Sequence, residues 1–278
     1  MSNNIILGVK KEEDPSENRV SIVPKDIKSI RTLGIEVNVE KGAGEKAGYS
    51  DEEYLNAGAI ILENLSENTN LVTSVNAFYN KKTKFIQNSY VISLSDIRTN
   101  PETAKTCEEN LISLFAMELV PRIARAQKLD ALSSQASIAG YRAGLIAATS
   151  LKKYLPLMMT AAGTIPPSSI LVLGAGVAGL QAIATTKRLG ADVTGYDIRL
   201  AAGEQIESLG AKFISDEVPD DTETKGGYAK EQSQDKQKTQ LEFLKEYILK
   251  SDAVITTAAI PGRKAPILIE KTTVEQMK

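Results

Sequence analysis

Short apolar runs alternate with helix-like patterns along the first half of the chain. The apolar runs have the length of strands, and the segments between them carry hydrophobic residues at helical spacing. We expect strands at Ile5–Lys10, Glu36–Glu40, Leu71–Val75, Tyr90–Leu94 and Leu111–Met117. We expect helices at Pro24–Leu33, Asp51–Ala57 and Pro101–Asn110. Because strands and helices alternate, the pattern predicts parallel strands joined by crossover helices, which is an α/β layer fold.

The second half repeats this alternation after a long segment rich in Ala, Ser and Leu. Residues Ala131–Tyr154 predict one helix that links the halves, and we expect a loop at 163–169. We then expect strands at 170–173, 191–197, 211–214 and 253–258, with helices at 177–189, 200–209 and 241–249. The two halves therefore share one architecture.

Length and charge narrow the class of protein. The 278 residues suffice for two domains of about 150 residues each. With 33 basic and 35 acidic residues, the net charge of −2 gives no broad basic field for nucleic acid or an anionic membrane. No apolar run approaches the ~20 residues that cross a bilayer, and we expect no secretion signal at the N-terminus.

Histidine is absent from the sequence, and cysteine occurs once, at Cys107. The commonest general acid/base and the commonest metal ligand are therefore missing, so we expect no metal site. A single thiol forms no internal disulfide and suits a reducing compartment. We expect Cys107 to be an inert helix residue, because no histidine or second thiol can activate it.

The strand expected at 170–173 runs into three glycines, Gly174, Gly176 and Gly179, spaced G-x-G-x-x-G, and a helical pattern follows at once. A dinucleotide pyrophosphate needs this order: a tight turn, a backbone that phosphates can approach, and a helix N-terminus with unpaired N–H groups. The next strand ends at Asp197, roughly 20 residues on, where a carboxylate accepts hydrogen bonds from an adenosine ribose. The sequence therefore predicts a dinucleotide site in this half.

Two loops are open to more than one interpretation. The glycine-rich run 42–48 could hold phosphate, but it lacks the strand–turn–helix order, so we favour a connector followed by a helix cap at Ser50-Asp51. The polar stretch from Asp216 to about Gln240 is too long for an ordinary connection and predicts either a lid or disorder. Gly226-Gly227 supplies a hinge there, and Tyr228 is an aromatic residue that could fold over a ligand.

Several ordered segments together resemble the NAD(H)-binding domain of proton-translocating nicotinamide nucleotide transhydrogenase, a family related to the alanine dehydrogenases. The resemblance rests on the dinucleotide turn through Arg199 and on the segments 17–24, 121–135, 139–142, 226–230 and 256–263. It implies an α/β protein of two Rossmann-like domains with parallel sheets, joined by a long helix, with a cleft between them. We expect a flavodoxin-like domain at 1–132, the linking helix at 133–160 and the Rossmann NAD(H) domain at 161–278.

The resemblance also implies roles for individual residues. Arg122, Gln127, Asp130 and Ser133 would line the nicotinamide end, where a carboxylate and a hydroxyl can orient the carboxamide and so select a ring face. Residues expected to contact the rest of the nucleotide are Gly174, Gly176, Val177, Ala178, Gly179, Asp197, Ile198, Arg199, Tyr228 and Ala258. Asp197 favours NAD over NADP because it repels a 2′-phosphate, whereas Arg199 could accept one. We give the acid more weight.

Two features separate transhydrogenase from amino-acid dehydrogenase. Oxidative deamination needs a proton donor and acceptor near the ring, and the resembling alanine dehydrogenases use a histidine and a substrate-binding lysine. This chain has no histidine, and Ser74 stands in the lysine position; Arg19 matches a carboxylate-binding arginine but would act alone. Hydride transfer between two nicotinamides needs only positioning. We therefore favour transhydrogenase; an alanine-dehydrogenase-like enzyme and a non-catalytic NAD-binding module remain alternatives.

The resemblance further implies partners and a location. The chain would bind NAD(H), form a homodimer, and meet an NADP(H)-binding domain and a membrane-spanning subunit without entering the membrane itself. It would lie on the cytoplasmic face of a bacterial inner membrane, or face the matrix if mitochondrial. The family's domain continues beyond Lys278, so we expect either a natural short subunit or a shortened piece of a longer domain.

Overall fold

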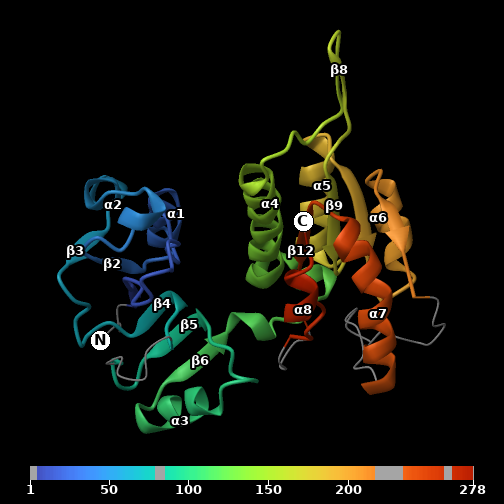
Figure 1. The fold of residues 1–278 in the computed structure, drawn as a ribbon. Coiled ribbons are helices and arrows are strands. Elements are labelled where there is room, and N and C mark those ends of the chain that lie inside the picture. The colour runs from blue at the N-terminus through green and yellow to red at the C-terminus, as the bar shows by residue number, and fades with distance from the viewer. Residues whose placement is uncertain (1–4, 79–84, 217–233, 260–264, 278) are drawn as a thin grey trace. The chain divides into compact units, whose positions relative to one another are not determined.

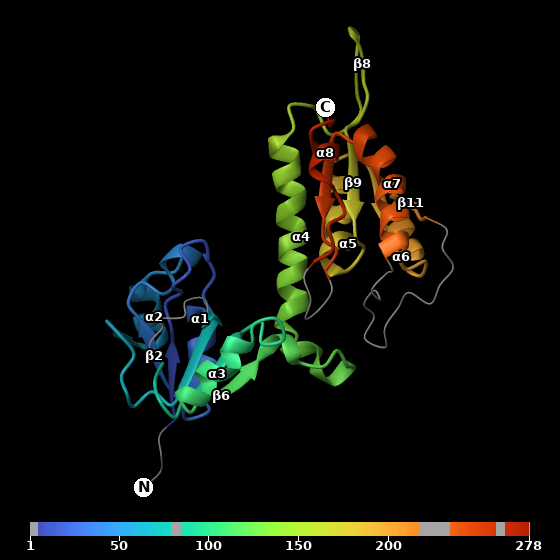
Figure 2. The same cartoon turned by 60° about the horizontal axis from the view of Figure 1, so that its bottom comes forward.

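The computed structural model describes residues 5–78, 85–216, 234–259 and 265–277, and the side chains of 234–237 are left aside. The chain divides into two compact units, Met1–Asp130 and Ala131–Lys278, and each is an α/β unit built on a parallel sheet. The expected α/β fold class is therefore confirmed. Figures 1 and 2 show the elements of each unit.

The first unit is a six-stranded sheet in the order β3-β2-β1-β4-β5-β6, with every neighbouring pair parallel. Its strands are β1 (Ile6–Val9), β2 (Glu36–Glu40), β3 (Ile60–Leu62), β4 (Leu71–Asn76), β5 (Tyr90–Leu94) and β6 (Ser113–Ala116). Its helices are α1 (Pro24–Arg31), α2 (Asp51–Ala57) and α3 (Pro101–Glu109), with 3-10 turns η1 (Glu45–Ala47), η2 (Met117–Leu119) and η3 (Ala124–Leu129).

A capping box holds the start of α2. The Ser50 side chain accepts from the Glu53 backbone N–H, and the Glu53 carboxylate accepts from the Ser50 N–H at 2.7 Å. Asp51 accepts from the Gly42 backbone N–H at 2.8 Å, so the helix also fixes the glycine-rich loop before it. The expected cap at Ser50-Asp51 is confirmed.

The second unit contains a four-stranded parallel sheet in the order β11-β10-β9-β12. The strands are β9 (Ser169–Leu173), β10 (Asp192–Tyr196), β11 (Lys212–Ile214) and β12 (Ala253–Thr256). The helices are α4 (Ala131–Ser150), α5 (Val177–Arg188), α6 (Ala202–Ser208), α7 (Gln234–Lys250) and α8 (Lys271–Val274). Strands β7 (Met158–Thr160) and β8 (Gly163–Ile165) form a separate antiparallel hairpin.

Several element limits differ from the sequence predictions. The loop expected at 163–169 is wrong in its first part, because Gly163–Ile165 pairs with Met158–Thr160 as the hairpin. Strand β3 was not expected. The predicted helix to Tyr154 ends at Ser150 in α4, five residues before the pre-proline position Leu155, where helical geometry is disfavoured. Strand β6 begins two residues late because Leu111 has a φ of 55°, which interrupts extended backbone.

Helix α4 packs closely on α5 through two buried glycines. A β-carbon on Gly140 would stand 2.0 Å from the backbone oxygen of Ala178, in the first turn of α5. A β-carbon on Gly144 would meet the Thr185 side chain at 3.0 Å. Ala143 and Ala147 of α4 pack against the apolar cluster of this unit. The first turn of α5 is therefore held by β9 before it and by the backbone of α4 beside it.

Candidate functional site: the turn between β9 and α5

The turn from β9 into α5 has the geometry that a phosphate-binding turn requires. Strand β9 is buried at four successive positions, Ile170 to Leu173, so the chain reaches the turn from a rigid core strand. Gly174 then takes a φ of 95°, which only glycine adopts without strain, and Gly176 caps α5 in extended geometry. The first turn of α5 leaves backbone N–H groups without intrahelical partners, and these attract an anion.

The three glycines of the turn serve different purposes. A β-carbon on Gly174 would stand 2.8 Å from the backbone nitrogen of Ala258, and one on Gly179 would stand 1.8 Å from the carbonyl oxygen of Gly174. Both positions are therefore closed by protein backbone. A β-carbon on Gly176 would meet nothing within 4 Å. Gly176 is thus the one of the three whose missing side chain leaves space for a ligand rather than for the protein.

The turn lies at the topological switch point of its sheet. The chain leaves β9 toward β10 on one side, while β12 pairs with β9 on the other, so the carboxyl ends of β9 and β12 flank a crevice. Thr257, directly after β12, donates through its hydroxyl to the Gly174 carbonyl at 2.8 Å, and its N–H donates to Leu173 at 2.8 Å. Sequence analysis missed Thr257; its position just after a predicted strand was the available signal.

Asp197 lies directly after β10 and is buried, with 7% of its surface exposed. Its carboxylate accepts from the Ala175 backbone N–H at 2.7 Å, which ties the end of β10 to the glycine turn. It also accepts from Arg199, through the backbone N–H and two guanidinium nitrogens, each at 2.9 Å. The structure therefore brings together three of the predicted site regions: the turn, Asp197 and Arg199.

The other expected nucleotide contacts differ in their surroundings. Val177 is exposed at the start of α5, Ala178 is also on the exposed side of that turn, and Ile198 and Ala258 pack on one apolar cluster of the second unit. Tyr228 lies outside the described residues, as does the hinge at 226–227. These positions give the turn an apolar border on the side of β12.

The residues expected at the nicotinamide end lie around the boundary of the two units. Arg122 and Gln127 are named first: Arg122 is exposed, Gln127 is part of η3, and its carbonyl accepts from the Asp130 N–H at 3.2 Å. Asp130 is the last residue of the first unit, and Ser133 belongs to the first turn of α4. Their role toward a nicotinamide stays a prediction.

These features fit a dinucleotide. The open position at Gly176 admits a phosphate to the backbone, the start of α5 supplies N–H donors, and Asp197 supplies an acceptor one strand away. Among the residues that the structure describes, no group of three or more Cys, Asp or Glu side chains could hold a metal ion. The site therefore depends on backbone donors and one carboxylate.

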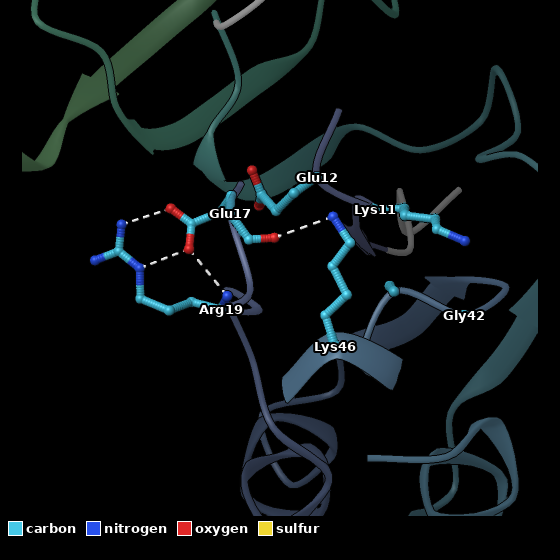
Figure 3. A pocket seen from close by; sticks show the side chains of 7 residues that line it. Lys11, Glu12, Glu17, Arg19, Gly42 and Lys46 are labelled. Atoms are coloured by element: carbon cyan, nitrogen blue, oxygen red, sulfur yellow. Dashed lines mark hydrogen bonds and ion pairs between the residues drawn. The ribbon is translucent and has the colours of Figure 1, made fainter. Parts of the chain in front are cut away.

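The first unit has its own switch point, between β1 and β4, and carboxylates fill it. Glu12 accepts from the Ser74 hydroxyl at 3.0 Å and from the N–H groups of Val75 at 2.6 Å and Asn76 at 3.1 Å. Glu17 accepts from Arg19 Nε at 2.8 Å and Nη2 at 2.6 Å, and this hydrogen bonding lowers the pKa of the Glu17 carboxyl. Figure 3 shows the Glu17–Arg19 pair in a small pocket beside Glu12 and Lys46.

This arrangement concerns the residues aligned with a substrate-binding lysine and arginine in alanine dehydrogenases. Ser74, in the lysine position, brings no charge and donates to Glu12, and Arg19 is paired with Glu17. A carboxylate substrate at this place would meet two protein carboxylates, and like charges repel. The pocket is therefore poorly suited to an amino acid or a 2-oxo acid.

Two matches to protein families cover nearly the whole chain. Residues 8–139 match the family described as alanine dehydrogenase/PNT, N-terminal domain, and residues 143–278 match alanine dehydrogenase/PNT, C-terminal domain. The two-unit α/β fold and the glycine turn agree with these matches. The chain belongs to the alanine dehydrogenase/PNT family.

Within this family, the chain is similar to transhydrogenase subunits. It is 43% identical over 283 residues to an NAD(P) transhydrogenase subunit alpha of Rhodospirillum rubrum, covering 98% of this chain and 74% of that protein. It is 45% identical over 275 residues to the subunit of the same name from Rickettsia prowazekii, covering 96% and 72%. Both identities are measured over nearly the full length of this chain, so they extend well beyond the glycine turn.

Solved structures give the same grouping. The crystal structure of transhydrogenase from Sinorhizobium meliloti superposes with a TM-score of 0.82 at 40% identity, covering 98% of this chain and 75% of that one. An L-alanine dehydrogenase superposes with a TM-score of 0.75 at 22% identity, covering 99% and 72%, which shows a shared fold. Among the helices that the structure describes, none is both long and apolar enough to cross a membrane.

Proposed function

We propose that this chain is the NAD(H)-binding component of a proton-translocating transhydrogenase, which passes hydride between NADH and NADP+ held on a partner domain. The observation that carries the proposal is the glycine turn at the β9–β12 switch point, with Asp197 beside it, in a chain 43% and 45% identical to transhydrogenase alpha subunits. The identity extends over both units, so it includes the residues assigned to the nicotinamide end.

Each group of residues has a role in this proposal. The backbone from Gly174 to Gly179 binds the pyrophosphate, Asp197 accepts from the adenosine ribose, and Ile198 and Ala258 border the adenosine. Asp130 and Ser133 orient the carboxamide, Arg122 lies beside it, and Gln127 points toward the partner domain. Tyr228 closes over the bound nucleotide. The nicotinamide supplies the hydride, and the protein supplies position.

Direct transfer between two nicotinamides makes few chemical demands on side chains. It requires no protein proton donor, which agrees with a sequence that has no histidine. Holding two rings with reacting atoms about 3–3.5 Å apart can by itself lower the barrier by several kcal/mol. The pairing of Glu12 with Ser74 and of Glu17 with Arg19 argues against the amino-acid dehydrogenase alternative. Proton translocation would reside in membrane-spanning parts outside this chain.

The proposal includes partners and a location. The chain would act as a homodimer, together with an NADP(H)-binding domain and a membrane-spanning subunit. It would lie peripherally on the cytoplasmic face of a bacterial inner membrane, or on the matrix side in a mitochondrion. The name of the relatives, subunit alpha, supports a complex of several subunits.

The test is reconstitution with an isolated transhydrogenase NADP(H)-binding domain. Mixed with that domain, the chain should catalyse reduction of an NAD+ analogue by NADPH, followed by the absorbance of the reduced analogue. Gln127→Ala should slow the transfer while NADH affinity is kept, and Lys128→Ala, an exposed neighbour on η3, serves as the matched control. Tight NADH binding without any transfer would contradict the proposal. NADH oxidation dependent on pyruvate and ammonia by the chain alone would favour the dehydrogenase alternative.

A further inference from the structure

The carboxylate of Asp197 has every acceptor position occupied within the protein. A carboxylate offers about four lone-pair sites on its two oxygens. Oδ1 accepts from the Arg199 backbone N–H and from Arg199 Nε, both at 2.9 Å. Oδ2 accepts from the Ala175 N–H at 2.7 Å and from Arg199 Nη2 at 2.9 Å. No acceptor site is left for a ribose hydroxyl.

The four donors divide into two fixed and two removable ones. The N–H groups of Ala175 and Arg199 belong to the backbone of the glycine turn and of the segment after β10, so they stay. The other two donors are one guanidinium fork, which matches the two oxygens of a carboxylate. The pair is sheltered, with 17% of the Arg199 side chain and 8% of the Asp197 side chain exposed. The fork also reaches the turn, since Nη2 lies 3.4 Å from the Ala175 carbonyl oxygen.

We propose, on the basis of the proposed function, that Arg199 is a specificity-determining residue that stands in for the adenosine ribose on Asp197. The 2′- and 3′-hydroxyls of a ribose offer two donors, the same number that the guanidinium gives. NAD(H) binding therefore exchanges two guanidinium donors for two hydroxyl donors, and the Arg199 side chain must leave the carboxylate. Arg199 thus lowers the apparent affinity for NAD(H), because only the fraction of molecules with a released carboxylate can bind.

The same residue reduces discrimination against a 2′-phosphate. Asp197 repels the phosphate, whereas a guanidinium neutralises the carboxylate and can itself hold a phosphate with two parallel hydrogen bonds. Arg199 therefore has opposite effects on the two coenzymes: it competes with the ribose of NAD(H) and assists the phosphate of NADP(H). Without Arg199, the preference for NAD(H) should become sharper.

Calorimetric titration of the whole chain with NADH and, separately, with NADPH tests this role. Arg199→Ala should lower the Kd for NADH by about three- to tenfold and raise the Kd for NADPH. Arg199→Lys, which presents a point charge rather than a planar fork, should fall between wild type and Ala. Asp197→Asn should weaken NADH binding and improve NADPH binding relative to wild type. Arg188→Ala, in the last turn of α5 and away from the glycine turn, should change neither Kd.

The outcomes separate the two claims. NADH affinity that is unchanged or weaker in Arg199→Ala would overturn the role of Arg199, because a stand-in can only compete. A wild-type chain that binds neither coenzyme would contradict the proposed function itself. Thermal unfolding without nucleotide checks that each variant is folded, and Arg199→Lys gives the same comparison if Arg199→Ala is not.

Discussion

The carbonyl oxygen of Gly174 lies where a side chain on Gly179 would begin: a β-carbon on Gly179 would stand 1.8 Å from it. The two glycines let the end of β9 and the first turn of α5 touch through backbone alone. This contact aims the helix N-terminus along the turn, since neither segment can tilt toward the other. The phosphate-binding geometry of the second unit therefore depends on a contact between two residues that have no side chains.

Gly179→Ala should destabilise the second unit and weaken NADH binding. Overpacking of this kind costs roughly 1–3 kcal/mol, and a contact with backbone gives little room for relaxation. Thermal unfolding should show a midpoint lowered by several degrees, and calorimetry a higher Kd for NADH. The matched control is Gly176→Ala, whose β-carbon meets nothing within 4 Å and should leave the unfolding midpoint nearly unchanged. A Gly179→Ala protein as stable as wild type would contradict this contact.

Gly140→Ala and Gly144→Ala should differ in sign although both lie on α4. Alanine in a helix gains about 1 kcal/mol over glycine from propensity in each case. At Gly144 the neighbour is the Thr185 side chain at 3.0 Å, which can shift slightly, so stability should change little or rise. At Gly140 the neighbour is the backbone oxygen of Ala178 at 2.0 Å, so α4 must move off the first turn of α5. Gly140→Ala should therefore be less stable and bind NADH more weakly; equal effects of the two substitutions in thermal unfolding and calorimetry would contradict this packing.

Tyr54 predicts a pH dependence of the first unit. Its side chain is fully buried, its hydroxyl donates to the Ile22 carbonyl at 2.7 Å, and burial raises its pKa to about 12 from 10.0. Because the folded-state pKa is raised, the stabilisation is complete below pH 10 and is lost as the pH rises toward 12. Tyr54→Phe should cost about 1 kcal/mol at neutral pH, and this difference from wild type should shrink above pH 10.

Urea unfolding of wild type and Tyr54→Phe at pH 7 to 11 measures that difference, with pH 10.0 as the unperturbed value for tyrosine. Tyr90→Phe, at a side chain 51% exposed, is the matched control and should follow wild type at every pH. A difference between wild type and Tyr54→Phe that stays constant through this range would show that Tyr54 does not titrate as its burial implies.

Local patterns were enough to predict the site's frame. The turn at Gly174 to Gly179 and the acid after the next strand are short-range signals, because the glycine spacing, the strand and the helix follow one another directly. The fold class followed from the alternation of strand and helix. The hairpin β7–β8 was missed because each strand has three residues and pairs only with the other, so no long pattern marks it.

The use made of the site residues could not be predicted from spacing. The sequence presents Asp197 and Arg199 as competing signals for two coenzymes, and only the fold shows that they bind each other while Asp197 also binds Ala175. Thr257 reaches Gly174 from 83 residues away in sequence, across two neighbouring strands. Contacts of this kind depend on which strands are adjacent, and strand order is a property of the whole sheet. Helix α7 likewise begins at Gln234, inside a stretch that its polarity marked as irregular.

The binding of NADH to Gly176→Val tests the central claim most directly. Gly176 has a φ of −77° and open space where its β-carbon would stand, so a valine should leave the fold and the unfolding midpoint close to those of wild type. The same side chain would fill the place where the pyrophosphate approaches the backbone. Calorimetry should show saturable NADH binding to wild type and its loss in folded Gly176→Val. A folded variant that binds NADH as tightly as wild type would contradict the claim that this turn holds the coenzyme.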